Sequence, residues 1–144
     1  MGVSAKRIMN GTFGELWLNG EKVAECYGLQ AKTTFNKEEI NQCGDLAVDS
    51  KITSIKNTGS MKLNKVFSRM ASALTESIST GTDVRFTIIS KLADPDAYGA
   101  ERIALYDVSF DDLTLADWEA KKAGTVECPF TFIRAEFLDK TEVQ

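Results

Sequence analysis

The sequence predicts a mainly β fold, a β-sandwich or β-barrel with one flanking α-helix. About seven or eight segments are rich in Val, Ile, Phe, Thr and Tyr and are separated by turn residues. Only one segment, residues 64–81, repeats its apolar residues at helical spacing. A chain of 144 residues is long enough to bury one core, so we expect a single domain over residues 1–144 that begins with an N-terminal arm, residues 1–12.

Composition and charge exclude several classes of protein. The net charge of −4 argues against a protein built to grip nucleic acid, which would carry a basic surface. No apolar run approaches the ~20 residues of a membrane span, so no membrane anchor is expected. The three cysteines, Cys26, Cys43 and Cys128, form no Cys-x-x-Cys pair, which favours reduced thiols in a cytoplasmic setting over a zinc site.

The chain contains no histidine, and this narrows the possible chemistry. Ser-His-Asp and Cys-His catalysis are excluded, as is the commonest ligand of transition metals. Catalysis by paired carboxylates stays open, and the best candidates are Asp94, Asp96, Asp111, Asp112, Asp117 and Glu119. The Asp-Pro-Asp segment 94–96 is first of all a turn, so the structural interpretation outweighs the catalytic one. We therefore predict no enzyme, and no catalytic, cofactor-binding or metal-binding residue.

The first hairpin is expected around Asn19-Gly20, the strongest short hairpin signal. A two-residue loop places Leu16, Leu18 and Val23 on one face, which is the candidate core face. Trp17 falls on the other face, among charged residues. It is either an ordinary, partly exposed aromatic residue or a contact for a neighbouring chain.

A strand is expected from Gly28, followed by a long segment, residues 36–50, without a convincing period. Compact domains rarely keep such a loop without a use. Three interpretations stay open: a mobile loop, a short helix around residues 38–42, or an arm that becomes ordered against a partner.

Residues 51–66, KITSIKNTGSMKLNKV, alternate between apolar and polar side chains on both sides of Asn-Thr-Gly. The pattern predicts a hairpin with a three-residue loop, residues 57–59, in which Gly59 adopts the left-handed conformation. One face then carries Thr53, Ile55, Met61 and Leu63, with Ile52 an exception on the polar face. The polar face consists of Ser54, Lys56, Ser60, Lys62 and Asn64.

One amphipathic helix follows, in which Phe67, Met70, Leu74 and Ile78 recur at helical spacing before Gly81 ends it. Strands are then expected in residues 83–92, 101–110, 112–119 and 125–138. Pro129 removes one ladder donor, which indicates a sheet edge or a bulge.

Three stretches carry a resemblance to a known family: GELWLNGEKVAE, FTIISKLADPDAYGAERIALYDVSFDDLTLADWE and CPFTFIRAEFLD. Their order over residues 11–139 resembles the tail tube proteins of contractile-tailed bacteriophages, defective prophages and R-type tailocins of Gram-positive bacteria. The most specific part is GAERIALYDVSF followed later by Pro-Phe-Thr-Phe.

The resemblance implies a structural protein. In this family six copies form a ring whose strands join edge to edge into one closed barrel, and a long hairpin of each subunit joins that barrel. Rings stack into a hollow tube inside a contractile sheath, and baseplate and tail terminator proteins cap its ends. The lumen passes DNA in a phage. Assembly is expected in the bacterial cytoplasm.

For this chain we expect the polar face of residues 54–64 to line the channel. The candidate lumen residues are Ser54, Lys56, Ser60, Lys62 and Asn64, and the alternative is an ordinary exposed sheet face. The candidate assembly contacts are Trp17, Asn36, Glu38, Glu39, Asn41, Asp45 and Asp49. The sheath is expected on the exposed side of the helix, at Arg69, Ser72 and Glu76. The alternatives to a tube protein are a monomeric β-barrel that binds a small ligand or carbohydrate, and a carboxylate hydrolase.

Overall fold

The computed structural model describes residues 2–66 and 68–141. Two short 3-10 turns precede the first strand, at Ala5–Arg7 and Gly11–Phe13. Eight strands and two short helices follow in the described residues. In chain order they are β1 Gly14–Leu18, β2 Glu21–Lys22, β3 Cys26–Ile40, β4 Asp49–Asn64, α1 Arg69–Ala73, α2 Thr75–Thr80, β5 Phe86–Leu92, β6 Glu101–Phe110, β7 Thr125–Thr131 and β8 Arg134–Asp139.

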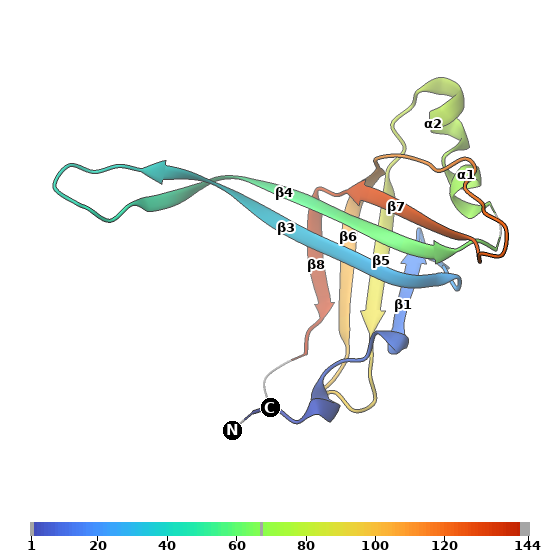
Figure 1. The fold of residues 1–144 in the computed structure, drawn as a ribbon, viewed down its shortest axis with the longest axis horizontal. Coiled ribbons are helices and arrows are strands. Elements are labelled where there is room, and N and C mark those ends of the chain that lie inside the picture. The colour runs from blue at the N-terminus through green and yellow to red at the C-terminus, as the bar shows by residue number, and fades with distance from the viewer. Residues whose placement is uncertain (1, 67, 142–144) are drawn as a thin grey trace.

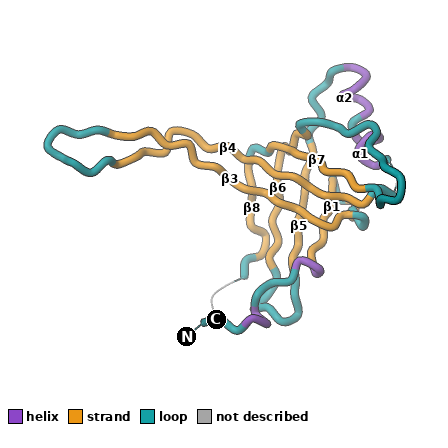
Figure 2. The backbone as a smooth tube through the Cα atoms, in the orientation of Figure 1, coloured by secondary structure: helices purple, strands orange, loops and turns teal. Residues whose placement is uncertain are grey.

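The strands form one antiparallel path, β2-β1-β5-β6-β7-β4-β3, with β8 paired to β6. The path folds into two layers at β6, which pairs with β5 and β8 along most of its length and with β7 at its end. At this bend Asp107 has φ 55, and the β5–β6 register shifts between Phe86 and Ile88, as in a β-bulge. Figures 1 and 2 show β3, β4 and β7 crossing over β1, β5, β6 and β8. The predicted mainly β, two-layer fold is confirmed.

The core lies between these two layers. Phe130 and Met61 from one layer meet Ile88, Leu105 and Val108, and all five are almost fully buried. Three phenylalanine rings, Phe86, Phe110 and Phe130, pack edge to face with centroid distances of 5.3 and 5.9 Å, a preferred aromatic geometry.

The first hairpin is as predicted. Asn19 and Gly20 both have positive φ, 51 and 87, as a type I′ turn requires. Trp17 pairs with Lys22 and Leu18 pairs with Glu21. Leu16, Leu18 and Val23 are all buried in the core, whereas Trp17 is partly exposed.

The predicted turn at residues 57–59 is wrong. These residues lie inside β4, which pairs with β3 from Leu63↔Cys26 to Asp49↔Ile40. Gly59 is needed for close packing. A Cβ atom there would lie against the carbonyl oxygen of Gln30 and 2.7 Å from Cζ of Phe130. A glycine that admits a close neighbour and a glycine that makes a turn look the same in a sequence.

The long loop predicted for residues 36–50 is only partly a loop, because the two strands extend into it from both ends. Residues 36–40 complete β3, residues 49–50 begin β4, and the connection is residues 41–48. A bulge at Thr53 shifts the register, so that Ser54 pairs with Asn36 but Ile52 pairs with Lys37. Ile52 therefore shares the face of Ile55 and was wrongly placed on the polar face.

The single helix expected before Gly81 is two short helices that break at Leu74, φ −99 and ψ 7. Met70 and Leu74 are buried as predicted, and Gly81 ends α2 in the left-handed conformation. Ile78 is exposed, so the apolar stripe does not reach it. Phe67 lies outside the described residues.

Two further strand predictions need correction. Residues 112–119 are not strand but part of the connection between β6 and β7. The strand expected over residues 125–138 is two strands, β7 and β8, each in contact with β6. Pro129 is confirmed at an edge: its carbonyl accepts from the Asp111 amide, so its nitrogen points to the side where the pairing with β6 ends.

Candidate assembly surfaces

The outer face of the β3–β4–β7 layer is polar. Residues directly opposite each other in an antiparallel pair share a face, so cross-strand rows define it. Lys62 lies between Gly28 and Glu127, and Ser60 lies between Gln30 and Pro129. Lys56 faces Thr34, and Ser54 accepts a hydrogen bond of 3.0 Å from Asn36 Nδ2. The five residues predicted to line a channel therefore lie on one face of β4.

The predicted face stays correct although the predicted turn is wrong. Residues 54, 56, 60, 62 and 64 have the same parity, and side chains alternate along an uninterrupted strand. A three-residue hairpin loop would have kept the same two sets. Over residues 54–64 of β4 and their partners this face is mainly positive, since Lys32, Lys56 and Lys62 outnumber Glu127.

Beyond the body, β3 and β4 continue as a projecting hairpin, residues 33–57 (Figure 1). β7 pairs with β4 only from Asn64 to Thr58, so the strands of the projecting hairpin pair with each other alone in the described chain. Its strand part spans about 25 Å at ~3.3 Å per residue. Asn57 Nδ2 donates to the Ile133 carbonyl at 2.9 Å, which joins the hairpin to the body. Within the hairpin, Thr33 Oγ1 donates to Asn57 Oδ1 at 2.9 Å.

The projecting hairpin carries an apolar face that no other part of the described chain covers. Phe35 pairs with Ile55, and Ile52 follows on the same face after the bulge. Their exposed fractions are 52% for Phe35, 57% for Ile55 and 49% for Ile52. Large apolar side chains grouped in this way typically mark an interaction site. The sequence prediction placed Ile55 on an apolar face but did not bring it together with Phe35, because it paired residues 51–56 with residues 60–65 across a turn at residues 57–59.

The predicted assembly contacts fall into two places. Trp17 lies on the outer face of the β1–β5–β6–β8 layer, opposite Ile89 of β5. The others lie on the projecting hairpin and its tip: Asn36, Glu38, Glu39, Asn41, Asp45 and Asp49. Two of these also support the local backbone, because Asp45 Oδ1 accepts from the Ala47 amide at 3.0 Å and Asp49 Oδ1 accepts from the Ser50 amide at 2.8 Å.

Several strand edges are open in the described chain. β3 ends the sheet path and pairs with β4 alone, while β8 pairs with β6 alone. β7 pairs with β6 only at Phe130 and Thr131. The rest of the β7 edge that faces away from β4, beginning at Thr125, is therefore open. Unpaired edges are templates for pairing with another chain.

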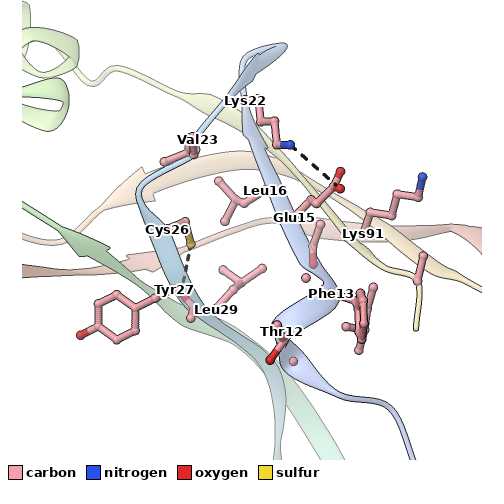
Figure 3. Close-up of a pocket in the computed structure, with 17 residues that line it drawn as sticks. Thr12, Phe13, Glu15, Leu16, Lys22, Val23, Cys26, Tyr27, Leu29 and Lys91 are labelled. Atoms are coloured by element: carbon pink, nitrogen blue, oxygen red, sulfur yellow. Dashed lines mark hydrogen bonds and ion pairs between the residues drawn. The ribbon is translucent and has the colours of Figure 1, made fainter. Parts of the chain in front are cut away.

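A groove of about 890 Å³ lies between β1 and the start of β3, beside the loops that flank them. Figure 3 shows Leu16 and Leu29 pointing into the space between the two strands, with Cys26 beside them. Tyr27 points away from this space, and Lys22 forms an ion pair with Glu15 at 4.0 Å on the far side of β1. The groove could not be predicted from the sequence, because three separate segments build it.

The titratable groups support structure rather than catalysis. Asp94 is buried and accepts from the Asn10 amide at 2.8 Å and the Asp96 amide at 2.9 Å, so it makes a turn and fastens the N-terminal segment. Asp94 follows β5 and Asp111 follows β6. Because β5 and β6 are antiparallel, the two carboxylates lie at opposite ends of the sheet. Among the described residues, no three Cys, Asp or Glu side chains come together as metal ligands would.

Arg69 corrects the predicted sheath surface. Its Nε lies 2.9 Å from Oε1 of Glu25, whose side chain is 5% exposed. Its Nη1 lies 3.7 Å from Oε2 of a second carboxylate, Glu21. The guanidinium therefore faces the body, whereas Ser72 and Glu76 are exposed. This ion pair fastens α1 to the start of β3.

Burial also controls the thiols. Burial raises the pKa of Cys128 to about 11, with a further contribution from the charge of Asp112. Burial likewise raises the pKa of Cys26, whose Sγ donates to the Gly28 carbonyl at 3.4 Å. A hydrogen bond of 3.1 Å to Glu136 raises the pKa of Tyr106. The thiols of Cys26 and Cys128 therefore stay protonated and unreactive at neutral pH.

Residues 1–139 match the model of a family described as phage tail tube protein. This chain belongs to the phage tail tube family. The resemblance drawn from the sequence motifs is thereby confirmed, and nothing supports the alternative of a monomeric ligand-binding β-barrel.

The tail tube relatives include a prophage protein. XkdM, of the phage-like element PBSX of Bacillus subtilis (strain 168), is 33% identical over 134 residues, which cover 92% of this chain and 91% of XkdM. Two solved structures share the tail tube fold. A chain of the anti-feeding prophage tube-terminating cap matches 97% of this chain and 97% of its own length, with TM-score 0.74 and 9% identity. A chain of the PVC extracellular contractile injection system, in its extended sheath–tube complex, matches 94% of this chain and 98% of its own length, with TM-score 0.72 and 11% identity.

Neither helix in the described part of this tail tube protein has the length and apolar run to cross a membrane.

Proposed function

We propose that this chain is the repeating subunit of the inner tube of a contractile phage or phage-like tail. Six copies form a ring, and rings stack into a hollow conduit inside the sheath. The role is structural and not enzymatic, and residues 1–144 act as a single tube domain. Assembly takes place in the bacterial cytoplasm, with sheath, baseplate and tail terminator proteins as partners.

One observation carries this proposal: the β3–β4–β7 layer is an incomplete sheet. Its outer face is polar, its inner face is the core, and both its edges are open. Closing six such layers edge to edge pairs every open edge at once and leaves a polar face toward the lumen. The open edges of β3 and β7 lie on opposite sides of the layer, as joining one subunit to the next requires.

On this proposal the channel is lined by Ser54, Lys56, Ser60, Lys62 and Asn64. A ring repeats each lysine six times, which makes the lining basic except where Glu127 stands opposite Lys62. DNA passing through such a lumen binds more strongly at low salt than at high salt. Contacts between subunits and rings fall on Trp17 and the projecting hairpin, the latter with Asn36, Glu38, Glu39, Asn41, Asp45 and Asp49.

Electron microscopy of the purified protein tests the proposal. We expect rings with six-fold symmetry and stacked tubes, and a reconstruction in which the side chains of Lys56 and Lys62 point into the lumen. A protein that stays monomeric at high concentration would overturn the proposal. Tubes in which these lysines point outward would overturn the lumen assignment alone.

A further inference from the structure

The connection between β6 and β7, residues 111–124, contains neither helix nor strand. Compact domains rarely keep an irregular segment of about this length without a use. We propose that Trp118, on this connection, docks into the groove between β1 and β3 of the next copy in the ring. The proposal rests on the proposed function, because it names a side-chain contact at the seam where the β7 edge of one copy meets the β3 edge of the next.

Trp118 has the properties of an interface anchor. Its exposed fraction is 86%, and that of Leu115, three positions earlier on the same connection, is 79%. Large apolar side chains exposed on one short segment typically mark a contact site. Tryptophan is also enriched among the few residues that dominate binding energies, because its ring buries a large apolar area.

The groove offers such an anchor a pocket of fitting chemistry. Its volume is about 890 Å³, within the range of about 300–1,000 Å³ that is typical of binding clefts. The apolar side chains of Leu16, Val23, Leu29 and Leu92 line it. Leu16 and Val23 belong to the core, so they form a fixed floor, and Phe13 is exposed at the rim.

The strand order brings the connection and the groove to the same seam. β3 and β7 both pair antiparallel with β4, so they run in the same direction. Cys26 of β3 and Val126 of β7 both lie opposite Leu63, at the same level of the layer. Cys26 lines the groove, and the connection ends just before β7 begins at Thr125. Joining the β7 edge of one copy to the β3 edge of the next therefore brings the connection beside the groove.

The connection and the groove lie on opposite sides of one molecule, which favours a second copy as the occupant. Figure 1 shows the connection beside α1, on the upper side of the β3–β4–β7 layer. The start of β1, which borders the groove, lies below that layer in the same view. A contact between opposite sides of identical subunits is head to tail, and its repetition closes into a ring or extends into a filament.

Charge favours the same partner. The connection has more acids than bases, the acids being Asp111, Asp112, Asp117 and Glu119 and the bases Lys121 and Lys122. The N-terminal segment that leads into the groove, residues 2–13, carries Lys6 and Arg7 and no acid. In the turn that holds this segment, Asp94 is buried and accepts from two backbone amides, and Asp96 is exposed. An acidic connection therefore meets a segment whose accessible bases outnumber its accessible acids, and such complementarity steers association.

Two variants test the contact from its two sides. Trp118→Ala removes the anchor, and Ala24→Trp fills the groove from its wall. Both positions are exposed, so the monomers should keep their circular dichroism and melting temperature. We expect each variant to need a protein concentration roughly tenfold higher or more for assembly, as truncation of an interface anchor typically requires. Trp118→Phe and Ala24→Ser are the matched controls and should assemble like the wild type.

Tryptophan fluorescence shows directly whether the anchor becomes buried. The chain has two tryptophans, and Trp118→Phe keeps only Trp17, so the difference between the wild-type and Trp118→Phe spectra reports Trp118. On assembly this difference emission should move to shorter wavelength and resist quenching by acrylamide.

The outcomes separate this contact from the tube function. Tubes in which Trp118 stays as quenchable as in the monomer would overturn this inference and leave the proposed tube function standing, as would normal assembly of both Trp118→Ala and Ala24→Trp. A wild type that stays monomeric at high concentration would overturn both.

Discussion

Replacing Gly59 by alanine tests whether packing, and not a turn, requires glycine at this position. Gly59 pairs with Ala31 on β3 and with Phe130 on β7. An added Cβ would lie against the carbonyl oxygen of Gln30 and 2.7 and 2.9 Å from two ring carbons of Phe130. The Phe130 ring is fully buried and is held between Phe110 and Phe132, so it has no space to move into.

The expected loss follows from these neighbours. Overpacking a core typically costs 1–3 kcal/mol, and because neither the backbone nor the ring yields, we expect the cost of Gly59→Ala to be about 3 kcal/mol. The smaller conformational entropy of the unfolded alanine variant offsets roughly 0.4–1 kcal/mol. The free energy of unfolding should therefore fall by about 2 kcal/mol, measured by urea denaturation of the dilute monomer.

Gly28→Ala is the matched control. Its Cβ would meet Cδ of Lys62 at 3.5 Å, an ordinary contact with a flexible side chain, so stability should change by less than about 0.5 kcal/mol. Adding Phe130→Leu should relieve part of the cost of Gly59→Ala, giving a coupling energy of about 1 kcal/mol. Additive losses, or a Gly59→Ala variant as stable as the wild type, would refute the packing argument.

Four other predictions concern single groups. Arg69→Leu should cost about 3 kcal/mol in urea denaturation, because it leaves the Glu25 carboxylate buried without its partner, and a cost below 1 kcal/mol would contradict this. In the monomer at pH 8 a thiol reagent should label Cys43 fastest, and Cys43→Ser should abolish that fast phase. The folded Cys128 thiol holds its proton more tightly than the unfolded one, so the free energy of unfolding should fall from pH 9.0 to about 11, and Cys128→Ala should flatten that fall. Asp107→Gly should raise stability by roughly 0.5–1 kcal/mol, since φ 55 suits glycine, and a loss would show that the aspartate side chain has a role of its own.

Local turn chemistry and alternation were the reliable signals in this sequence. The adjacent residues Asn19 and Gly20 both favour positive φ, so they select a type I′ turn without any distant contact. The two faces of β4 were also predictable, because parity along a strand does not depend on what its partner is. Both predictions needed only neighbouring residues.

The errors arose where distant contacts decide the outcome. Gly59 is required by Phe130, which lies 71 positions later in the chain, so the sequence around it gives the wrong reason for a glycine. The pairing of residues 36–40 with residues 49–54 likewise depends on register across a bulge. The bend that turns one sheet path into two layers sits at Asp107, which no turn motif marks.

Residues 36–40 and 49–50 of the projecting hairpin were predicted as part of a loop. A strand in the body of a protein has an apolar face against the core and a polar face against water. The resulting alternation of apolar and polar residues is what predicts a strand from the sequence. Here the apolar face is sparse, with Phe35, Ile52 and Ile55 separated by polar residues, because none of the described residues covers it. The strand is nevertheless kept straight by its partner strand and by the side-chain hydrogen bonds of Thr33 and Asn36. The segment is thus ordered by backbone pairing and by these side-chain hydrogen bonds, and not by a core, which is why its apolar pattern is weak.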